Sequence, residues 1–191
     1  MTLWNVGIIN GSNWHEEKVK MAETVYARLD LHTEKVGTPV VLAGDFNAPK
    51  RETQTGIVPH EGGGLQYRHY LFYGAPYFFA DGGEKREFLF RDRWKRAERS
   101  LFDPAVGGWG MVDAYWDATE GVKRPSTEDY THVVHTGDPS HKRLDHVLVS
   151  GHFDTNRCTI WKGEVDSIDG LGASDHAPVV TELAGPEGVS E

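Results

Sequence analysis

The sequence has little of several features that would assign it at once to a protein class. Its 191 residues include one cysteine, Cys158, which excludes an internal disulfide framework and a zinc site built on cysteines. We expect this lone thiol to be a small buried side chain. No apolar run approaches the ~20 residues that a membrane helix needs. The N-terminus shows no basic segment followed by an apolar one, so we expect no membrane span and a cytoplasmic location.

Basic residues are in the minority. There are 20 lysines and arginines against 29 aspartates and glutamates, a net charge of −9. Such a chain repels a polyphosphate at long range, which argues against a non-specific nucleic-acid coat protein but not against an enzyme with a local basic patch. With 38% hydrophobic and 26% charged residues, the composition is that of a folded globular protein. We expect a single domain over residues 1–184 and a flexible tail over 185–191.

Strands and a helix that alternate along the first part of the chain predict an α/β fold. Residues Asn5–Ile9 read as a strand, about Trp14–His32 as an amphipathic helix, and Pro39–Leu42 as a buried strand. The helix has Val19, Ala22, Tyr26 and Leu29 at helical spacing, and Asn13 lies three residues before Glu16, as in a capping pair. Further strands are predicted at Arg143–Val149, Thr159–Trp161 and Pro178–Leu183.

Two segments in the middle of the chain each allow two interpretations. The predicted helix Glu84–Leu101 has seven basic and four acidic residues. Its face with Arg91, Lys95 and Arg99 is either a solvated surface with ion pairs or a patch that binds phosphate. The aromatic segment Tyr67–Phe79 is either a loop packed on the core or a loop that faces substrate.

The first of three polar clusters is Gly44-Asp45-Phe46-Asn47, which directly follows a buried strand. Loops just beyond strand ends are where α/β proteins place their sites. A carboxylate and an amide two residues apart can serve a cation and a phosphoryl oxygen together. The simpler alternative is an Asx turn that closes the strand.

The second and third clusters lie far along the chain. In Arg143-Leu144-Asp145-His146, Asp145 points from a strand face that is otherwise apolar further on, so it needs a partner. That partner is either the neighbouring Arg143 or a catalytic imidazole. In Gly172-Ala173-Ser174-Asp175-His176-Ala177-Pro178, Asp175 can ligate a divalent metal and His176 can act as acid, base or phosphate donor.

Taken together, these clusters and their order resemble the endonuclease/exonuclease/phosphatase superfamily. Gly44-Asp45-Phe46-Asn47 follows a buried strand, Arg143-Leu144-Asp145-His146-Val147-Leu148-Val149-Ser150 comes later, and Ser174-Asp175-His176-Ala177-Pro178-Val179 precedes the last strand. Two more segments look like steps of the family pattern: Gly110-Met111-Val112-Asp113-Ala114, and Tyr130-Thr131-His132, in which His132 replaces the usual aromatic residue. The resemblance covers roughly Val40–Leu183.

The resemblance implies the C-terminal portion of a four-layer α/β sandwich and a divalent-metal-dependent phosphoesterase of nuclease or phosphatase type. Its cofactor would be Mg²⁺, or Mn²⁺ or Ca²⁺, and its substrate a nucleic acid or a small phosphate ester. Asp45 would orient the attacking water, Asn47 would hold a phosphate oxygen, and Asp145 would steer His176. Metal would be held by Asp175, Asp45 and Asn47. Independently of the resemblance, the basic side chains Arg91, Lys95, Arg99 and Arg143 are candidates for substrate binding.

The sequence also departs from the family pattern. Asp45 lies 44 residues after Met1, whereas family members have a further segment ahead of this region that supplies an Asn and the main metal-binding Glu. Asn10-Gly11-Ser12 stands where the family has a His. Glu16 and Glu17 are candidate replacements for the Glu, although a capping role explains them more simply.

Two alternative functions remain at this point. One is a catalytically incomplete homologue that acts as a binding or assembly module, as a homo-oligomer or with a polypeptide that supplies the missing half. The other is a zinc enzyme that uses His132 and His135 with His141 or His146, whose spacing is poor evidence for zinc.

Overall fold

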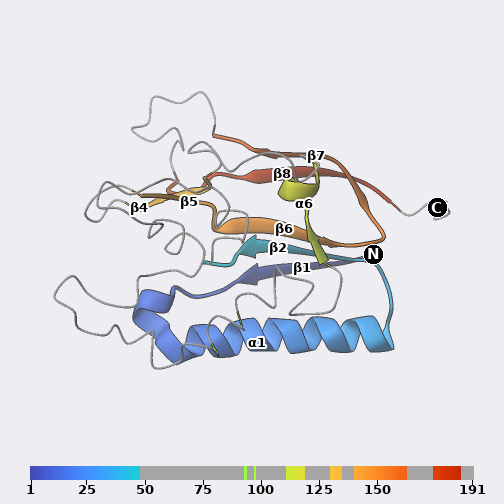
Figure 1. The fold of residues 1–191 in the computed structure, drawn as a ribbon, viewed down its shortest axis with the longest axis horizontal. Helices are drawn as coiled ribbons and strands as arrows, with labels where there is room; N and C mark the ends of the chain where they lie inside the picture. The colour runs from blue at the N-terminus through green and yellow to red at the C-terminus, as the bar shows by residue number, and fades with distance from the viewer. Residues whose placement is uncertain are drawn as a thin grey trace, which may run out of the picture.

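The computed structural model describes residues 1–47, 93, 97, 111–118, 130–134, 140–162 and 174–185. Its centre is a mixed four-stranded sheet in the order β1-β2-β6-β3 (Figure 1). The strands are β1 (Thr2–Gly7), β2 (Val40–Asp45), β6 (Asp145–Ser150) and β3 (Met111–Asp113). β1 runs parallel to β2, while β6 is antiparallel to both β2 and β3.

The remaining elements are short or paired. The strands β4 (His132–Val134) and β5 (Ser140–Lys142) form one antiparallel pair, and β7 (Asp154–Ile160) and β8 (Val179–Ala184) form another. The helix α6 (Ala114–Asp117) directly follows β3. The mixed α/β character predicted from the sequence is confirmed for the described residues.

The long helix α1 (Gly11–Lys35) lies along one face of the central sheet, and the β7–β8 pair lies on the other (Figure 1). Because successive side chains of a strand point to opposite faces of the sheet, a strand can contribute residues to the hydrophobic clusters on both sides. In β2, Val40 and Leu42 belong to the cluster that contains α1 residues, whereas Val41 belongs to the cluster packed against β7 and β8. In β6, Leu148 and Val149 divide in the same way, as the alternation in the sequence predicted.

The helix α1 is longer at both ends than the periodicity predicted. Val19, Ala22 and Leu29 form its buried stripe, as expected. Gly37, with φ 66°, ends the helix by donating its N–H to the carbonyl of His32 (3.1 Å). Because α1 begins at Gly11, Asn13 lies in its first turn, so the expectation that Asn13 and Glu16 cap the helix is wrong.

Gly44 allows β1 and β2 to approach closely just before the first polar cluster. Its φ is 143°, and a Cβ atom at this position would collide with the backbone carbonyl of Val6. Beyond it, the N–H of Ile8 donates to the carbonyl of Asp45 at 2.7 Å. The strand end that carries Asp45 is therefore fixed against β1 by backbone contacts.

A buried ion pair joins Asp113, at the end of β3, to Arg143, just before β6. Arg143 and Asp113 are 4% and 2% exposed, and the guanidinium donates two hydrogen bonds to the carboxylate, at 3.0 and 3.3 Å. The guanidinium also lies over the ring of Tyr115, 4.9 Å from its centroid. Arg143 was expected to pair with Asp145 or to bind substrate. Its burial and its bonds to Asp113 instead make it part of the core.

None of the helices in the described part of the chain is long and apolar enough to cross a membrane. Cys158 is a buried free cysteine, which confirms the expectation from the sequence. The proposed boundary at residue 184 coincides with the last residue of β8, while most of the predicted tail lies outside the described residues.

We predict that Arg143→Met lowers the free energy of unfolding by about 3–5 kcal/mol, because it leaves the Asp113 carboxylate buried without its counter-ion. Chemical denaturation measures this change. The matched control is Arg157→Met, since Arg157 and Glu182 form an exposed pair at 3.8 Å whose loss should be within measurement error. Equal effects of the two substitutions would contradict the assignment of a structural role to the buried pair.

Candidate functional site

Asp45 and Asn47 form a tight turn where β2 ends. The Asp45 Oδ1 accepts the backbone N–H of Asn47 at 2.7 Å, which is the Asx turn considered as the structural alternative. Asn47 has φ 47°, in the left-handed region that asparagine tolerates best among residues with a side chain. The ammonium group of Lys18, from the buried face of α1, donates to the Asn47 carbonyl at 2.7 Å. The turn is thus held from the helix side as well.

The side chain of Asn47 is fixed by two acceptors. Its Nδ2 donates to the carbonyl of Ile8 and to the Asp45 Oδ2, both at 2.7 Å. Both amide hydrogens therefore have protein acceptors, so a phosphate contact through this amide requires one of them to be released. The Oδ1 atom is what this side chain offers to a cation.

Asp145 and His176 form a close pair from two distant segments. The Nδ1 of His176 lies 2.7 Å from the Asp145 Oδ2. Asp145 begins β6 beside Asp45, its register partner across the β2–β6 ladder. Of the two partners considered for Asp145, the structure shows the imidazole and not Arg143.

Thr131 is the residue that brings these segments together. It is fully buried, and its hydroxyl oxygen accepts the backbone N–H groups of Leu144 (3.0 Å) and Asp145 (3.1 Å). Its own carbonyl accepts the N–H of Ala177 at 2.7 Å. One residue therefore sets the positions of both Asp145 and His176.

Asp45, Asp145 and His176 each offer a ligand atom within 4.8 Å of the others, which makes them a candidate metal-binding group. Burial raises the pKa of Asp45, and the nearby charge of Asp145 raises it further, although the Asn47 N–H opposes this. Burial alone would lower the pKa of His176, but the hydrogen bond and charge of Asp145, with Asp45 and Asp175, outweigh it and raise that pKa.

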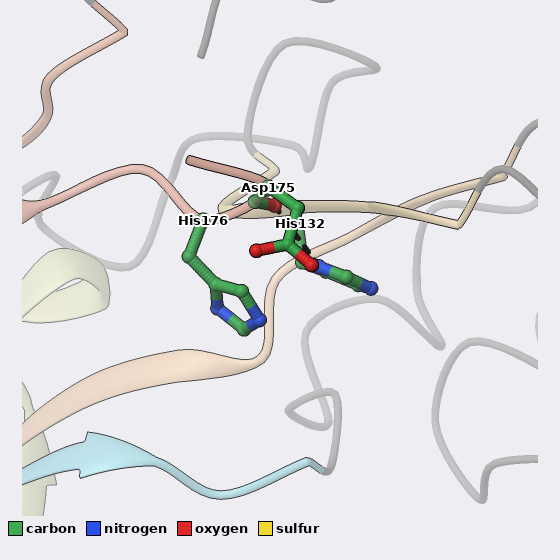
Figure 2. Close-up of side chains that lie close together, drawn as sticks. All are labelled: His132, Asp175 and His176. Carbon is green, nitrogen blue, oxygen red and sulfur yellow. Dashed lines mark hydrogen bonds between the residues drawn. The ribbon is translucent and has the colours of Figure 1, made fainter. Parts of the chain in front are cut away.

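A second group lies on the exposed side of the same histidine. The Nδ1 of His132 is 3.0 Å from the backbone carbonyl of Asp175, and the rings of His132 and His176 lie 4.4 Å apart (Figure 2). His132, Asp175 and His176 form the other candidate metal group among the described residues. Asp175, expected to share a metal with Asp45 and Asn47, is grouped here instead.

Among the other histidines predicted for a zinc site, His146 has a described side chain, and it lies in the core. His146 is 1% exposed, with its Nδ1 3.4 Å from a buried Asp113 oxygen and its ring edge-on to Phe46. In the described residues it joins neither metal-binding group. His135 lies outside those residues, and so does the side chain of His141.

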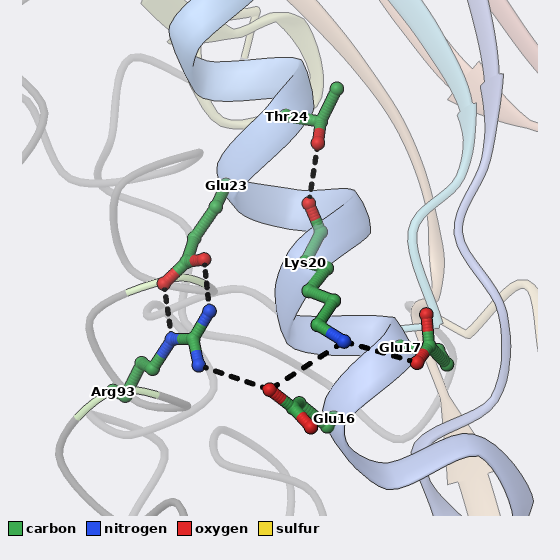
Figure 3. Close-up of polar contacts among 6 residues, drawn as sticks. All are labelled: Glu16, Glu17, Lys20, Glu23, Thr24 and Arg93. Carbon is green, nitrogen blue, oxygen red and sulfur yellow. Dashed lines mark hydrogen bonds and ion pairs between the residues drawn. The ribbon is translucent and has the colours of Figure 1, made fainter.

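Glu16 and Glu17 face an ion-pair network on the surface of α1 and not the Asp45 cluster. The ammonium group of Lys20 lies 3.6 Å from Glu16 and 3.2 Å from Glu17 (Figure 3). Arg93 pairs with Glu23 through two hydrogen bonds of 2.8 Å and with Glu16 at 3.4 Å. Neither glutamate belongs to a metal-binding group in the described part of the chain.

Most of the predicted second helix, with Arg91, Lys95 and Arg99, lies outside the described residues, as does the aromatic segment Tyr67–Phe79. Arg93 and Ala97 are described, and both are helical. Arg93 points to the carboxylates of α1 (Figure 3). Arg93 is two residues from Arg91 and from Lys95 in sequence, so its contacts do not decide between the two interpretations of their face.

Sequence reasoning assigned no role to Lys18 or Thr131 and placed His132 with other histidines. No pattern near Lys18 in the sequence indicated its contact, because the Asn47 carbonyl that accepts its hydrogen bond lies 29 residues away. Thr131 and His132 did have one, since the Tyr130-Thr131-His132 step was already noticed as part of the family pattern.

Comparison with solved structures supports the fold. The 3′ phosphatase NExo from Neisseria, bound to a product DNA hairpin, aligns over 95% of this chain and 60% of its own length, with 18% identity and a TM-score of 0.52. The catalytic domain of Xenopus laevis APE2 aligns over 90% of this chain and 45% of its own, with 14% identity and a TM-score of 0.51. A Bacteroides thetaiotaomicron protein described as an endonuclease/exonuclease/phosphatase family member aligns over 94% of this chain and 48% of its own, with 17% identity and a TM-score of 0.46.

The chain spans roughly half the length of these structures, and at such low identity the likeness shows the fold alone. No family model and no curated protein matches the sequence. The described chain shares its fold with part of the Neisseria 3′ phosphatase and with part of the APE2 catalytic domain.

We predict that the imidazole of His176, followed by NMR in metal-free protein, titrates at a higher pH than a histidine in a short peptide. In Asp145→Asn the midpoint should fall, because the carboxylate that stabilises the imidazolium is gone. An unchanged midpoint in Asp145→Asn would show that the pair at 2.7 Å does not form in solution.

Proposed function

We propose that this chain carries the catalytic half of a divalent-metal-dependent phosphoesterase, which cleaves a phosphodiester or phosphomonoester by in-line attack of water. The observation that carries the proposal is the Asp45, Asp145 and His176 cluster, with His176 bonded to Asp145 at 2.7 Å. A carboxylate that orients an imidazole next to a second carboxylate supplies both proton transfer and a place for a cation.

The donor atoms fit a hard divalent cation such as Mg²⁺. Asp45 and Asn47 offer oxygen atoms, and Asp145 adds a second negative charge within the same group. The raised pKa of Asp45 reflects burial and the neighbouring carboxylate, and a cation would relieve both. We assign Asp45 and the Oδ1 of Asn47 to the cation, which when bound would neutralise charge on the phosphoryl group.

The remaining roles concern protons. Asp45, which would hold the cation, would also orient the attacking water, since a water on that cation lies beside its carboxylate. The hydrogen bond and charge of Asp145 help to raise the pKa of His176, and the imidazolium would donate a proton from its other nitrogen, Nε2, to a phosphate oxygen or to the leaving group. Asp145 acts through the imidazole.

Basic side chains are the candidates for binding the phosphate groups of the substrate. We propose Arg91, Lys95 and Arg99 as the side chains that bind the substrate phosphates, while the buried Arg143 is no longer a candidate. The Neisseria structure holds a DNA hairpin, and by analogy a nucleic-acid end is one candidate substrate. A small phosphate ester is the other.

A second candidate function is an assembly module that needs a complementing half. The described residues form three layers, and we propose that the other half would complete the four-layer sandwich. β1 is an edge strand whose Leu3 is 65% exposed, as expected of a surface that pairs with more protein. In the described residues no glutamate joins the Asp45 group.

Hydrolysis of an aryl phosphodiester and an aryl phosphomonoester with Mg²⁺ or Mn²⁺ tests the proposal. We predict activity that a chelator abolishes and that His176→Ala lowers by about 10²–10⁴-fold, the usual contribution of a positioned acid or base. The matched control is Asp154→Asn, an exposed carboxylate at the start of β7, which should leave the rate unchanged.

Each outcome has a distinct meaning. No hydrolysis under any condition would contradict the enzymatic function of this chain and favour the module. Hydrolysis that persists in His176→Ala would show that His176 is not needed for the reaction. The effect of the chelator would then show separately whether hydrolysis requires a metal.

A further inference from the structure

His132 and His176 are held side by side by the backbone. They form an isolated antiparallel β-bridge, and the adjacent Thr131 carbonyl accepts the N–H of Ala177. The two rings are 4.4 Å apart and tilted by 35°. Figure 2 shows the Asp175 carboxylate beside them. Two imidazoles and a carboxylate are therefore gathered by fixed backbone rather than by chance side-chain positions.

The hydrogen bonds of the two histidines fix their tautomers. The Nδ1 of His132 faces a backbone carbonyl, which can only accept, so this nitrogen carries the proton. The Nδ1 of His176 faces the Asp145 carboxylate, which likewise accepts. In the neutral form of each ring the lone pair is then on Nε2. Histidines that bind metals in proteins almost always donate their other nitrogen to a carboxylate or a carbonyl in this way.

We propose that His132, Asp175 and His176 form a binding site for a transition-metal ion of the zinc class, distinct from the Mg²⁺ site assigned to Asp45 and Asn47. The ligands would be the two Nε2 atoms and a carboxylate oxygen of Asp175, with Asp145 and the Asp175 carbonyl as outer partners. Two imidazoles and one carboxylate are a recurrent zinc donor set that leaves a position open for water or substrate.

The distances are compatible with this site. One ligand atom from each of the three residues lies within 4.8 Å of the others. In a tetrahedral site with bonds of ~2.0–2.1 Å, ligand atoms are roughly 3.3 Å apart, so a pair at the 4.8 Å limit must close by about 1.5 Å. Asp175 is exposed and both histidines are half-buried, so side-chain rotation can supply this movement.

The chemistry of the donors selects the ion. Imidazole nitrogen is a good ligand for zinc, copper and nickel, whereas magnesium prefers oxygen and holds its water tightly. The Asp45 turn offers oxygen ligands. The two sites therefore differ in the ion that they prefer, while His176 belongs both to the zinc site and to the proposed catalytic group.

This shared histidine gives the site a consequence, which rests on the proposed function. A zinc ion on the Nε2 of His176 takes the place of the proton that this nitrogen would donate. Zinc would then inhibit hydrolysis supported by Mg²⁺, and it would do so through His132, a residue outside the proposed catalytic group.

Calorimetric titration of the metal-free full chain with Zn²⁺ tests the site without any assay of activity. We predict that His132→Phe, which keeps an aromatic ring against His176, weakens zinc binding by at least about tenfold, the lower end of the effect of losing even an outer partner. Asp175→Asn should also weaken binding. His152→Phe is the matched control, because His152 is exposed, its Nδ1 lies 3.1 Å from the Ser150 hydroxyl, and it belongs to neither metal-binding group of the described residues.

Zinc binding as tight in His132→Phe and Asp175→Asn as in the unaltered protein would overturn the proposal, as would equal weakening in His152→Phe. Circular dichroism of each variant separates lost binding from lost folding, and Asp175→Asn, at an exposed position, keeps the test available if His132→Phe unfolds. Zinc binding that needs His132 in a chain without hydrolytic activity would uphold the site and contradict only the proposed function.

Discussion

The hydrogen bonds of Thr131 are the constraint on which the arrangement of polar residues depends. Its buried hydroxyl accepts two consecutive backbone N–H groups at the start of β6, and its carbonyl accepts one from the segment before β8. Both segments carry a residue of the candidate site. Without the Thr131 hydroxyl, the N–H groups of Leu144 and Asp145 would lose this acceptor, and the start of β6 would be held less firmly relative to His176.

The central sheet supplies the rest of the geometry. Because β2 and β6 are antiparallel neighbours, Asp45 at the end of one lies opposite Asp145 at the start of the other. Burial of this edge raises the pKa of Asp45. Because Arg143 is paired with Asp113, its guanidinium does not take the place of His176 beside the Asp145 carboxylate. Two carboxylates and an imidazole thus come together at this edge as a candidate cation-binding group.

Local patterns in the sequence predicted what depends on neighbours along the chain. The stripe of Val19, Ala22 and Leu29 defined α1, alternation in β6 assigned Leu148 and Val149 to opposite faces, and the Asp45 turn followed from the residue types. These features need only the periodicity of helices and strands or the hydrogen bonding of a single side chain.

What could not be predicted depends on contacts between distant segments. Arg143 pairs with Asp113, 30 residues away, rather than with the nearby Asp145, and no spacing rule contains that choice. The contact of His132 with the Asp175 carbonyl spans 43 residues. The helix began earlier than the capping pattern indicated, because Asn and Glu three residues apart also occur inside helices. Such pairings are set by the register of the sheet.

The proposed function requires that Asp145 acts through His176, whose Nδ1 lies 2.7 Å from its carboxylate. The most direct test is a double-mutant cycle for Mg²⁺-dependent hydrolysis with Asp145→Asn, His176→Ala and the double variant. We predict that the double variant is no slower than His176→Ala alone, since residues that act as one unit give non-additive losses. Losses that multiply in the double variant would show that the two residues act independently and would contradict the claim.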